Sequence, residues 1–179
     1  MLTLDERDAV LRLARHALEA RVRGLAAPPG PVDRSFAVPY GVFVTLLCGG
    51  ELRGCLGRLD LDTELPVAVI ELAAAVSDSD PRFDAVCEAE LDTLEIEVSL
   101  LTTPREVVAL DEIDIGRHGL IVESGSKRGL LLPQVASDNG WDAAMLVAQT
   151  CLKAGLHRNA WPHGARLFAF EAVVFGDGG

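Results

Sequence analysis

Seven residues near the middle of the chain alternate strictly between apolar and polar side chains: Leu94-Glu95-Ile96-Glu97-Val98-Ser99-Leu100. Successive side chains of a β-strand point to opposite faces of the sheet, so this alternation predicts a strand with one buried face and one wet face. Glu95 and Glu97 share the wet face. The solvation of that face explains them better than a pair of catalytic carboxylates does.

Further strands are predicted on both sides of this one. Residues 40–48 are rich in β-branched and aromatic side chains, Gly49-Gly50 offers a tight turn, and an apolar pattern resumes at Leu52. This arrangement predicts a β-hairpin. A second hairpin and a closing strand are predicted from the apolar runs at residues 120–122, 130–132 and 166–175.

Three helices are predicted from apolar residues at helical spacing. Their start and stop signals are a capping box of Thr3 and Glu6 ending at Gly24, a Thr63 cap with Pro66 in the first turn, and an Asn139 cap ending before Gly155. The third helix is expected to bury Trp141, Met145, Ala148 and Leu152. Residues 26–38 contain several prolines, which remove backbone donors, and are expected to form a loop.

Bulk properties restrict the class of protein. A chain of 179 residues fits one domain over residues 1–179, with two lobes that share a core as the alternative. The net charge of −11 repels phosphate backbones and anionic membranes, which makes nucleic-acid binding unlikely on electrostatic grounds. The N-terminus is acidic, and no apolar run approaches the roughly 20 residues that span a bilayer. We therefore expect a cytoplasmic protein.

Cysteine and histidine spacing predicts no metal site. The four cysteines, Cys48, Cys55, Cys87 and Cys151, show no C-x-x-C pairing and are expected to be free thiols. The histidines show neither H-x-H nor H-E-x-x-H spacing. His118 stands beside Gly119 and is expected to be exposed in a turn, with a catalytic base as the alternative.

One hexapeptide carries the strongest candidate for chemistry: Leu52-Arg53-Gly54-Cys55-Leu56-Gly57. A positive charge beside a cysteine stabilises the thiolate, so Arg53 would make Cys55 a nucleophile or a soft metal ligand if the thiol is accessible. Gly54 and Gly57 would let the backbone turn tightly and approach a ligand. The alternative is a small buried thiol in a glycine-containing turn of a strand.

The hexapeptide resembles the signature of AMMECR-domain proteins, with Leu56 in place of the more usual isoleucine. Further blocks similar to that family follow in order: Asp80-Pro81-Arg82-Phe83, Leu94-Glu95-Ile96-Glu97-Val98-Ser99-Leu100-Leu101, Gly129-Leu130-Leu131-Leu132-Pro133-Gln134-Val135, and Cys151-Leu152-Lys153-Ala154-Gly155-Leu156 followed by Trp161. The resemblance implies an α+β fold, with a mainly antiparallel sheet and flanking helices in a larger and a smaller lobe. It covers most of the chain after about residue 38.

The same resemblance suggests partners but no reaction. Prokaryotic members of the family are often called protein A of the AmmeMemoRadiSam system, with a Memo-type protein and a radical S-adenosylmethionine enzyme as companions. Joint action on a shared substrate is the hypothesis that this implies. Neither the residues nor the resemblance names a cofactor, a reaction or an oligomeric state.

Three residues outside the hexapeptide are predicted to line a pocket with it. Arg82, Gln134 and Lys153 would supply a guanidinium, an amide and an ammonium. Each also has a structural interpretation, and Asp80-Pro81 suggests a helix cap with proline at the first position. Arg53 is expected to serve the pocket rather than the fold, because a buried arginine is costly.

Two classes of function remain open. The first is an enzyme, or a subunit of one, that uses Cys55 and Arg53 to act on a small anionic substrate. The second is a binding or adaptor module in which the glycine-bearing hexapeptide is a recognition surface and the thiol is incidental.

Overall fold

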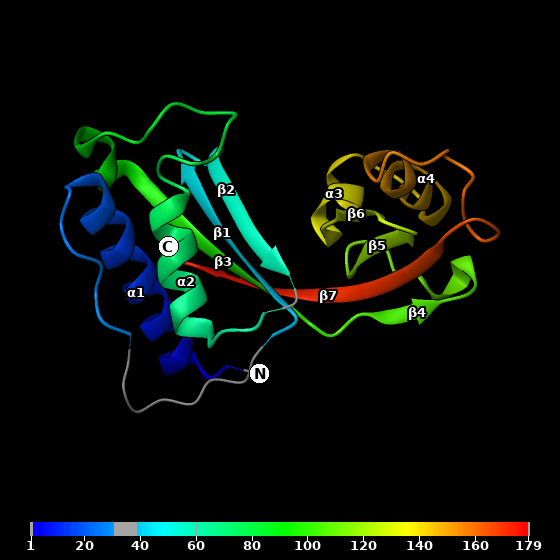
Figure 1. The fold of residues 1–179 in the computed structure, drawn as a ribbon, viewed down its shortest axis with the longest axis horizontal. Helices are drawn as coiled ribbons and strands as arrows, with labels where there is room; N and C mark the ends of the chain where they lie inside the picture. The colour runs from blue at the N-terminus through cyan, green and yellow to red at the C-terminus, as the bar shows by residue number, and fades with distance from the viewer. Residues whose placement is uncertain (1, 31–38, 60, 179) are drawn as a thin grey trace. The chain divides into compact units, whose positions relative to one another are not determined.

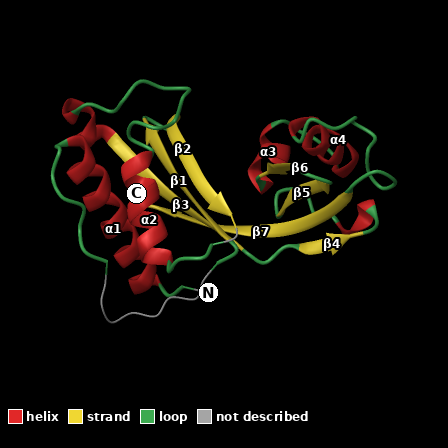
Figure 2. Cartoon of the chain, viewed as in Figure 1, coloured by secondary structure: helices red, strands yellow, loops and turns green. Residues whose placement is uncertain are grey.

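The computed structural model describes residues 2–30, 39–59 and 61–178 (Figures 1 and 2). The chain divides into two units, the first formed by Met1–Leu100 with Val173–Gly179 and the second by Leu101–Ala172. Helices flank strands that pair antiparallel in both units. The expected α+β fold is therefore confirmed. The segment 31–38, most of the expected loop, lies outside the described residues.

The first unit contains two long helices and a hairpin. Its elements are α1 (Leu4–Val22), β1 (Gly41–Cys48), β2 (Glu51–Leu59), α2 (Leu65–Ala75), the 3-10 helix η1 (Glu88–Thr93) and β3 (Leu94–Leu101). The strands follow the order β2-β1-β3, so β2 lies at an edge. Gly49 and Gly50 have φ of 59° and 80°, which suits the turn of the predicted hairpin.

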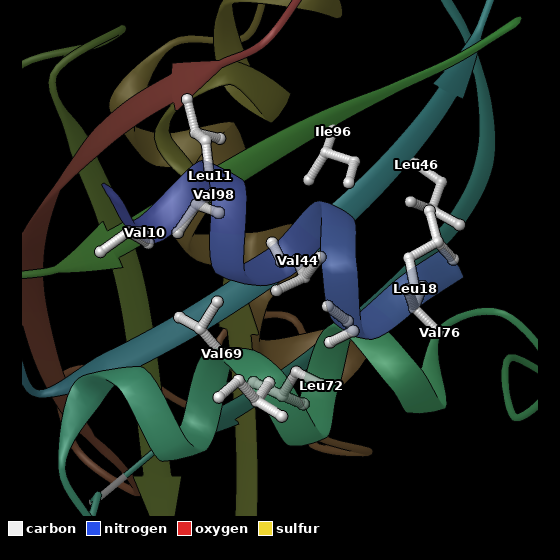
Figure 3. Packing of buried hydrophobic residues seen from close by; sticks show 14 of the residues in the cluster. Val10, Leu11, Leu18, Val44, Leu46, Val69, Leu72, Val76, Ile96 and Val98 are labelled. Atoms are coloured by element: carbon white, nitrogen blue, oxygen red, sulfur yellow. The ribbon is translucent and has the colours of Figure 1, made fainter. Parts of the chain in front are cut away.

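The core of this unit gathers side chains from α1, α2, β1 and β3 (Figure 3). Val44 of β1 and both Ile96 and Val98 of β3 are fully buried, as the alternating pattern predicts. Ser99 is also buried, so the alternation of buried and wet positions ends after Val98. The two helices cover the apolar face of the hairpin and β3 with their own apolar stripes.

The helix starts follow the sequence in one case and depart from it in the other. Thr3 and Glu6 form the predicted capping box of α1, in which the Glu6 backbone N–H donates to Thr3 Oγ1 over 3.3 Å. The N-cap of α2 is Glu64 and not Thr63. Pro66, three residues after Thr63, has no N–H to donate to the Thr63 hydroxyl, which leaves a cap at Thr63 with one fewer donor.

The second unit begins after β3. Its elements are β4 (Arg105–Val107), the 3-10 helix η2 (Leu110–Glu112), β5 (His118–Ser124), β6 (Lys127–Leu131), α3 (Pro133–Asp138), α4 (Ala143–Lys153) and the first part of β7 (Arg166–Gly176). β5 and β6 form the second predicted hairpin, and both β4 and β5 pair with β7.

The predicted buried face of α4 is wrong at Met145 and Leu152, whereas Ala148 is buried as predicted. Met145 and Leu152 are 37% and 50% exposed. The residues of α4 that are buried are Leu146, Val147, Ala148, Thr150 and Cys151. The helix begins later than predicted because Asn139 is the C-cap of a separate short helix, α3, and Gly140 has a φ of 63°. Asp142 caps α4 instead, and its carboxylate accepts the Met145 N–H over 2.7 Å.

His118 also differs from its prediction. It is buried, at 5% exposure, and its Nδ1 accepts the backbone N–H of Asp114 over 2.9 Å. His118 lies in a strand and not in a turn. The neighbouring Gly119 also belongs to β5 and lies against the Phe170 ring.

Within the described part of the chain, no helix is long and apolar enough to cross a membrane.

Candidate functional site

Cys55 lies on the edge strand β2, where one backbone side has no neighbouring strand. Its partner in the hairpin is Thr45 of β1, whose hydroxyl donates to Cys55 Sγ over 3.3 Å. The side chain is half-buried. The backbone N–H of Cys55 donates to Asp80 Oδ2 over 2.9 Å. The carboxylate of Asp80 therefore takes the place of a missing strand partner at this edge.

Asp80 is the centre of the polar cluster around Cys55. Its side chain is 3% exposed, and besides Cys55 it accepts the Arg82 backbone N–H at 3.1 Å, Arg82 Nε at 2.9 Å and Arg82 Nη2 at 2.6 Å. The hydrogen bond from the Arg82 side chain, with those from the two backbone N–H groups, holds the pKa of Asp80 well below its usual range despite burial. The predicted helix cap is wrong, because residues 80–83 form a turn.

Arg82 presents its positive charge to solvent on the outer side of this cluster. Its side chain is 54% exposed, against 3% for Asp80. The hydrogen bond to Asp80 raises the pKa of Arg82 against the opposing effect of desolvation, and the charges of Asp80 and Cys55 make smaller contributions that raise it further. The guanidinium also lies 5.4 Å from the centre of the Phe83 ring. Arg82 is therefore an exposed guanidinium whose carboxylate partner is buried.

Arg53 contacts other groups. Its Nε donates to Glu90 Oε1 over 2.7 Å, its Nη2 to Glu90 Oε2 over 3.2 Å, and its Nη1 to the Asp84 carbonyl over 3.0 Å. Only 19% of the side chain is exposed. The expectation that Arg53 is free to serve a pocket is therefore wrong. The segment that carries Asp84 and Glu90, which includes the start of η1, is held to β2 by these hydrogen bonds.

The pKa values of this second pair follow from its geometry. The hydrogen bond from Arg53, with one from the Cys87 backbone, lowers the pKa of Glu90 to about 2. The hydrogen bond to Glu90 raises the pKa of Arg53, and charges on Glu90, Asp84 and Cys87 add to the effect. The groups whose charges raise the pKa of Arg53 thus include Cys87, whereas those that raise the pKa of Arg82 include Cys55.

The two glycines of the hexapeptide serve packing. A Cβ on Gly57 would lie 2.1 Å from the Phe43 ring, and one on Gly54 would lie 3.2 Å from Val76. Both residues lie inside β2, and neither has a positive φ. The expectation that they form a tight turn is therefore wrong, and the turn of the hairpin is at Gly49-Gly50.

Gln134 and Lys153 lie in the second unit. Gln134 is exposed in the first turn of α3, and Lys153 is exposed at the last residue of α4. Their role at the Cys55 site remains a prediction. All four cysteines are free, with Cys48 and Cys87 exposed and Cys151 buried. Residues 2–30, 39–59 and 61–178 contain no group of three or more histidine, cysteine or acidic side chains that could hold a metal ion.

Comparisons with known proteins place the chain among similar archaeal proteins. A protein from Methanosarcina acetivorans is 41% identical over 186 residues, which cover 98% of this chain and 93% of the relative. One from Methanothermobacter thermautotrophicus is 40% identical, with coverage of 99% and 97%. The crystal structure of protein PH0010 from Pyrococcus horikoshii has a TM-score of 0.85 at 37% identity, over 94% of this chain and 89% of that one. Residues 11–175 match the AMMECR1 family, and the chain therefore belongs to that family.

Proposed function

We propose that this protein acts through Cys55, as an enzyme or enzyme subunit whose thiol meets a small anionic substrate held by Arg82. The observation that carries the proposal is the position of Asp80. Its buried carboxylate binds the backbone of Cys55 and the guanidinium of Arg82, so one group fixes both. Fixed positive charge beside a thiol favours reaction with an anionic partner.

In this proposal Arg53 has a supporting role. Its bonds to Glu90 and Asp84 tie the segment that carries Arg82 to the strand that carries Cys55. Arg53 is thus a positioning residue, and Arg82 is the group that contacts the substrate. Gly54 and Gly57 allow the close packing of β2, while Gln134 and Lys153 are further candidates for contact with the substrate.

The experiment measures whether a small anion shields Cys55. Inorganic phosphate is the probe, and the alkylation rate of each cysteine by iodoacetamide is followed by mass mapping of the folded protein. Millimolar phosphate is expected to slow the alkylation of Cys55 several-fold and to leave Cys48 unchanged. Cys48 is exposed and contacts the Thr93 hydroxyl, so it serves as an internal control. Equal rates at Cys55 with and without phosphate would contradict the anionic substrate.

A second candidate function is a binding or adaptor module. The observation in its favour is that Arg53, Gly54 and Gly57 each have a packing or pairing role in the fold. The family resemblance adds a Memo-type protein and a radical S-adenosylmethionine enzyme as proposed partners. Co-expression of the three proteins tests this candidate. If Cys55→Ser abolishes the turnover of a shared substrate but not co-purification, the enzyme is favoured, whereas unchanged turnover favours the adaptor.

A further inference from the structure

The second unit contains a pocket that shares no residue with the candidate site around Cys55. Its volume is about 420 Å³, within the range of small-molecule sites. The first half of α4, the start of η2 and residues 158–162 form its walls. Its apolar lining includes Trp161, Met145 and Leu110, of which the last two are 37% and 40% exposed. Large apolar side chains that gather at an open pocket are typical of a binding surface.

Local hydrogen bonds shape the wall formed by residues 158–162. His157 Nδ1 accepts the Asn159 N–H over 3.2 Å, and the His157 carbonyl accepts the Ala160 N–H over 2.9 Å. The Gly164 N–H donates to the Ala160 carbonyl, and the Gly164 carbonyl accepts the Ser124 hydroxyl over 2.7 Å. The wall is therefore formed before a ligand arrives, which reduces the ordering cost of binding.

Arg158 gives the pocket a charge without a counter-ion. It is exposed in the lining and pairs with no carboxylate among the described residues, although most other arginines do. Asp142 also lines the pocket, but one of its oxygens caps α4 through Met145. The side-chain amide of Asn159 stands beside Arg158 as a further donor.

We propose that this pocket binds a small carboxylate with an aromatic or branched apolar group. The guanidinium of Arg158 binds the carboxylate, and the apolar group packs on Trp161, Met145 and Leu110. A ligand with a single carboxylate fits better than a dianion, because the Asp142 carboxylate also lines the pocket and would repel a second negative charge. The site is independent of Cys55, so its failure would leave the proposed function unaffected.

Three probes of similar size test the charge preference: phenylacetate, phenylacetamide and phenethylamine. Binding is followed in two-dimensional ¹H–¹⁵N NMR spectra of the whole chain through its two tryptophan indole signals. Phenylacetate is expected to shift the Trp161 signal with a Kd of about 1 mM or below. Trp141, which does not line the pocket, should not respond. The amide and the amine are expected to bind at least tenfold more weakly.

Matched variants locate the charge. Arg158→Gln is expected to weaken phenylacetate binding at least tenfold. Arg12→Gln removes another exposed arginine, from α1 in the first unit, and should have no effect. Any of four results would overturn the proposal: no shift of Trp161 with phenylacetate, equal binding of the amide, strongest binding of the amine, or unchanged binding by Arg158→Gln.

Discussion

At the scale of single residues, the arginine next to Cys55 in the sequence is not the one that shares a carboxylate with its backbone. Arg53 is close to Cys55 in the sequence, yet its guanidinium binds Glu90 and Asp84. Arg82 is 27 residues away in the chain, yet it binds the same carboxylate, Asp80, as the Cys55 backbone N–H. Proximity in the sequence therefore does not determine which acceptor an arginine binds. The acceptors that the fold brings within hydrogen-bond distance of the guanidinium do.

The Glu90–Arg53 pair should make stability depend on pH. The pKa of Glu90 is lowered to about 2 in the folded chain from its ordinary value of 4.5, so its contribution to stability is complete above about pH 4.5 and is lost as pH falls towards 2. Glu90→Gln should lower the free energy of unfolding by about 1–2 kcal/mol at pH 6, after allowance for its partial exposure. The difference from the parent protein should approach zero near pH 2.

Urea unfolding at a series of pH values measures this difference. Glu88→Gln is the control, because Glu88 pairs with Arg23 at the exposed surface and should change stability little at any pH. A constant difference between Glu90→Gln and the parent protein across this pH range would show that the pair does not hold the loop to β2.

Some site residues could not be found from the sequence. A hairpin that turns at Gly49-Gly50 with regular pairing would place Val44 opposite Cys55. A register shift between Leu46 and Leu47 places Thr45 there instead. The sequence around Asp80 gives no sign of its role, because Asp80-Pro81-Arg82 looks locally like a helix cap. The edge of β2 that Asp80 covers can be recognised only in the fold.

At the scale of elements, the packing of β2 on β1 depends on the absence of a side chain at Gly57. A Cβ at position 57 would lie 2.1 to 2.4 Å from atoms of the Phe43 ring. Gly57→Ala should therefore destabilise the protein by about 1–3 kcal/mol through overpacking. In a Phe43→Leu background the same change should cost less, and the double-mutant cycle measures the difference in urea midpoints. Additive effects would show that the ring moves aside freely.

The faces of β3 lead to a second prediction at this scale. Val98 is fully buried and Glu97 is partly exposed on the opposite face. Val98→Ala should reduce the free energy of unfolding by about 1–3 kcal/mol, because it removes buried methyl groups and leaves a cavity. Glu97→Ala should do much less. Equal shifts of the two urea midpoints would mean that the strand's faces are assigned wrongly.

The sequence predicts the elements with strong periodicity and misses those that depend on context. α1, β3 and both hairpins follow from capping, alternation and turn residues. The short elements η1, η2, β4 and α3 have too few residues to show a period. The buried face of α4 was misplaced because Met145 and Leu152 look like core residues by type, while their exposure depends on what packs against the helix.

At the scale of the whole molecule, the net charge of −11 sets the background for both proposed sites. An acidic protein repels small anions on average, so a site that takes them needs local positive charge to overcome this field. In the two proposals Arg82 and Arg158 supply it in separate units, the first paired with a buried carboxylate and the second without a carboxylate partner among the described residues. Nearly all of the basic residues are arginines, whose planar guanidinium suits a carboxylate or phosphate partner.

The most direct test of the central claim compares the alkylation of Cys55 by anionic iodoacetate and neutral iodoacetamide. The ratio of the two rates reports the local charge, and division by the same ratio at Cys48 removes the effect of the overall charge. Two double variants keep the net charge and leave no carboxylate unpaired: Asp80→Asn with Arg82→Gln, and Arg53→Gln with Glu90→Gln. The normalised ratio should exceed one in the parent protein, fall several-fold in the first variant and change little in the second. A ratio that falls only in the second variant, or that is the same in all three proteins, would contradict the assignment of Arg82 as the charge that serves Cys55.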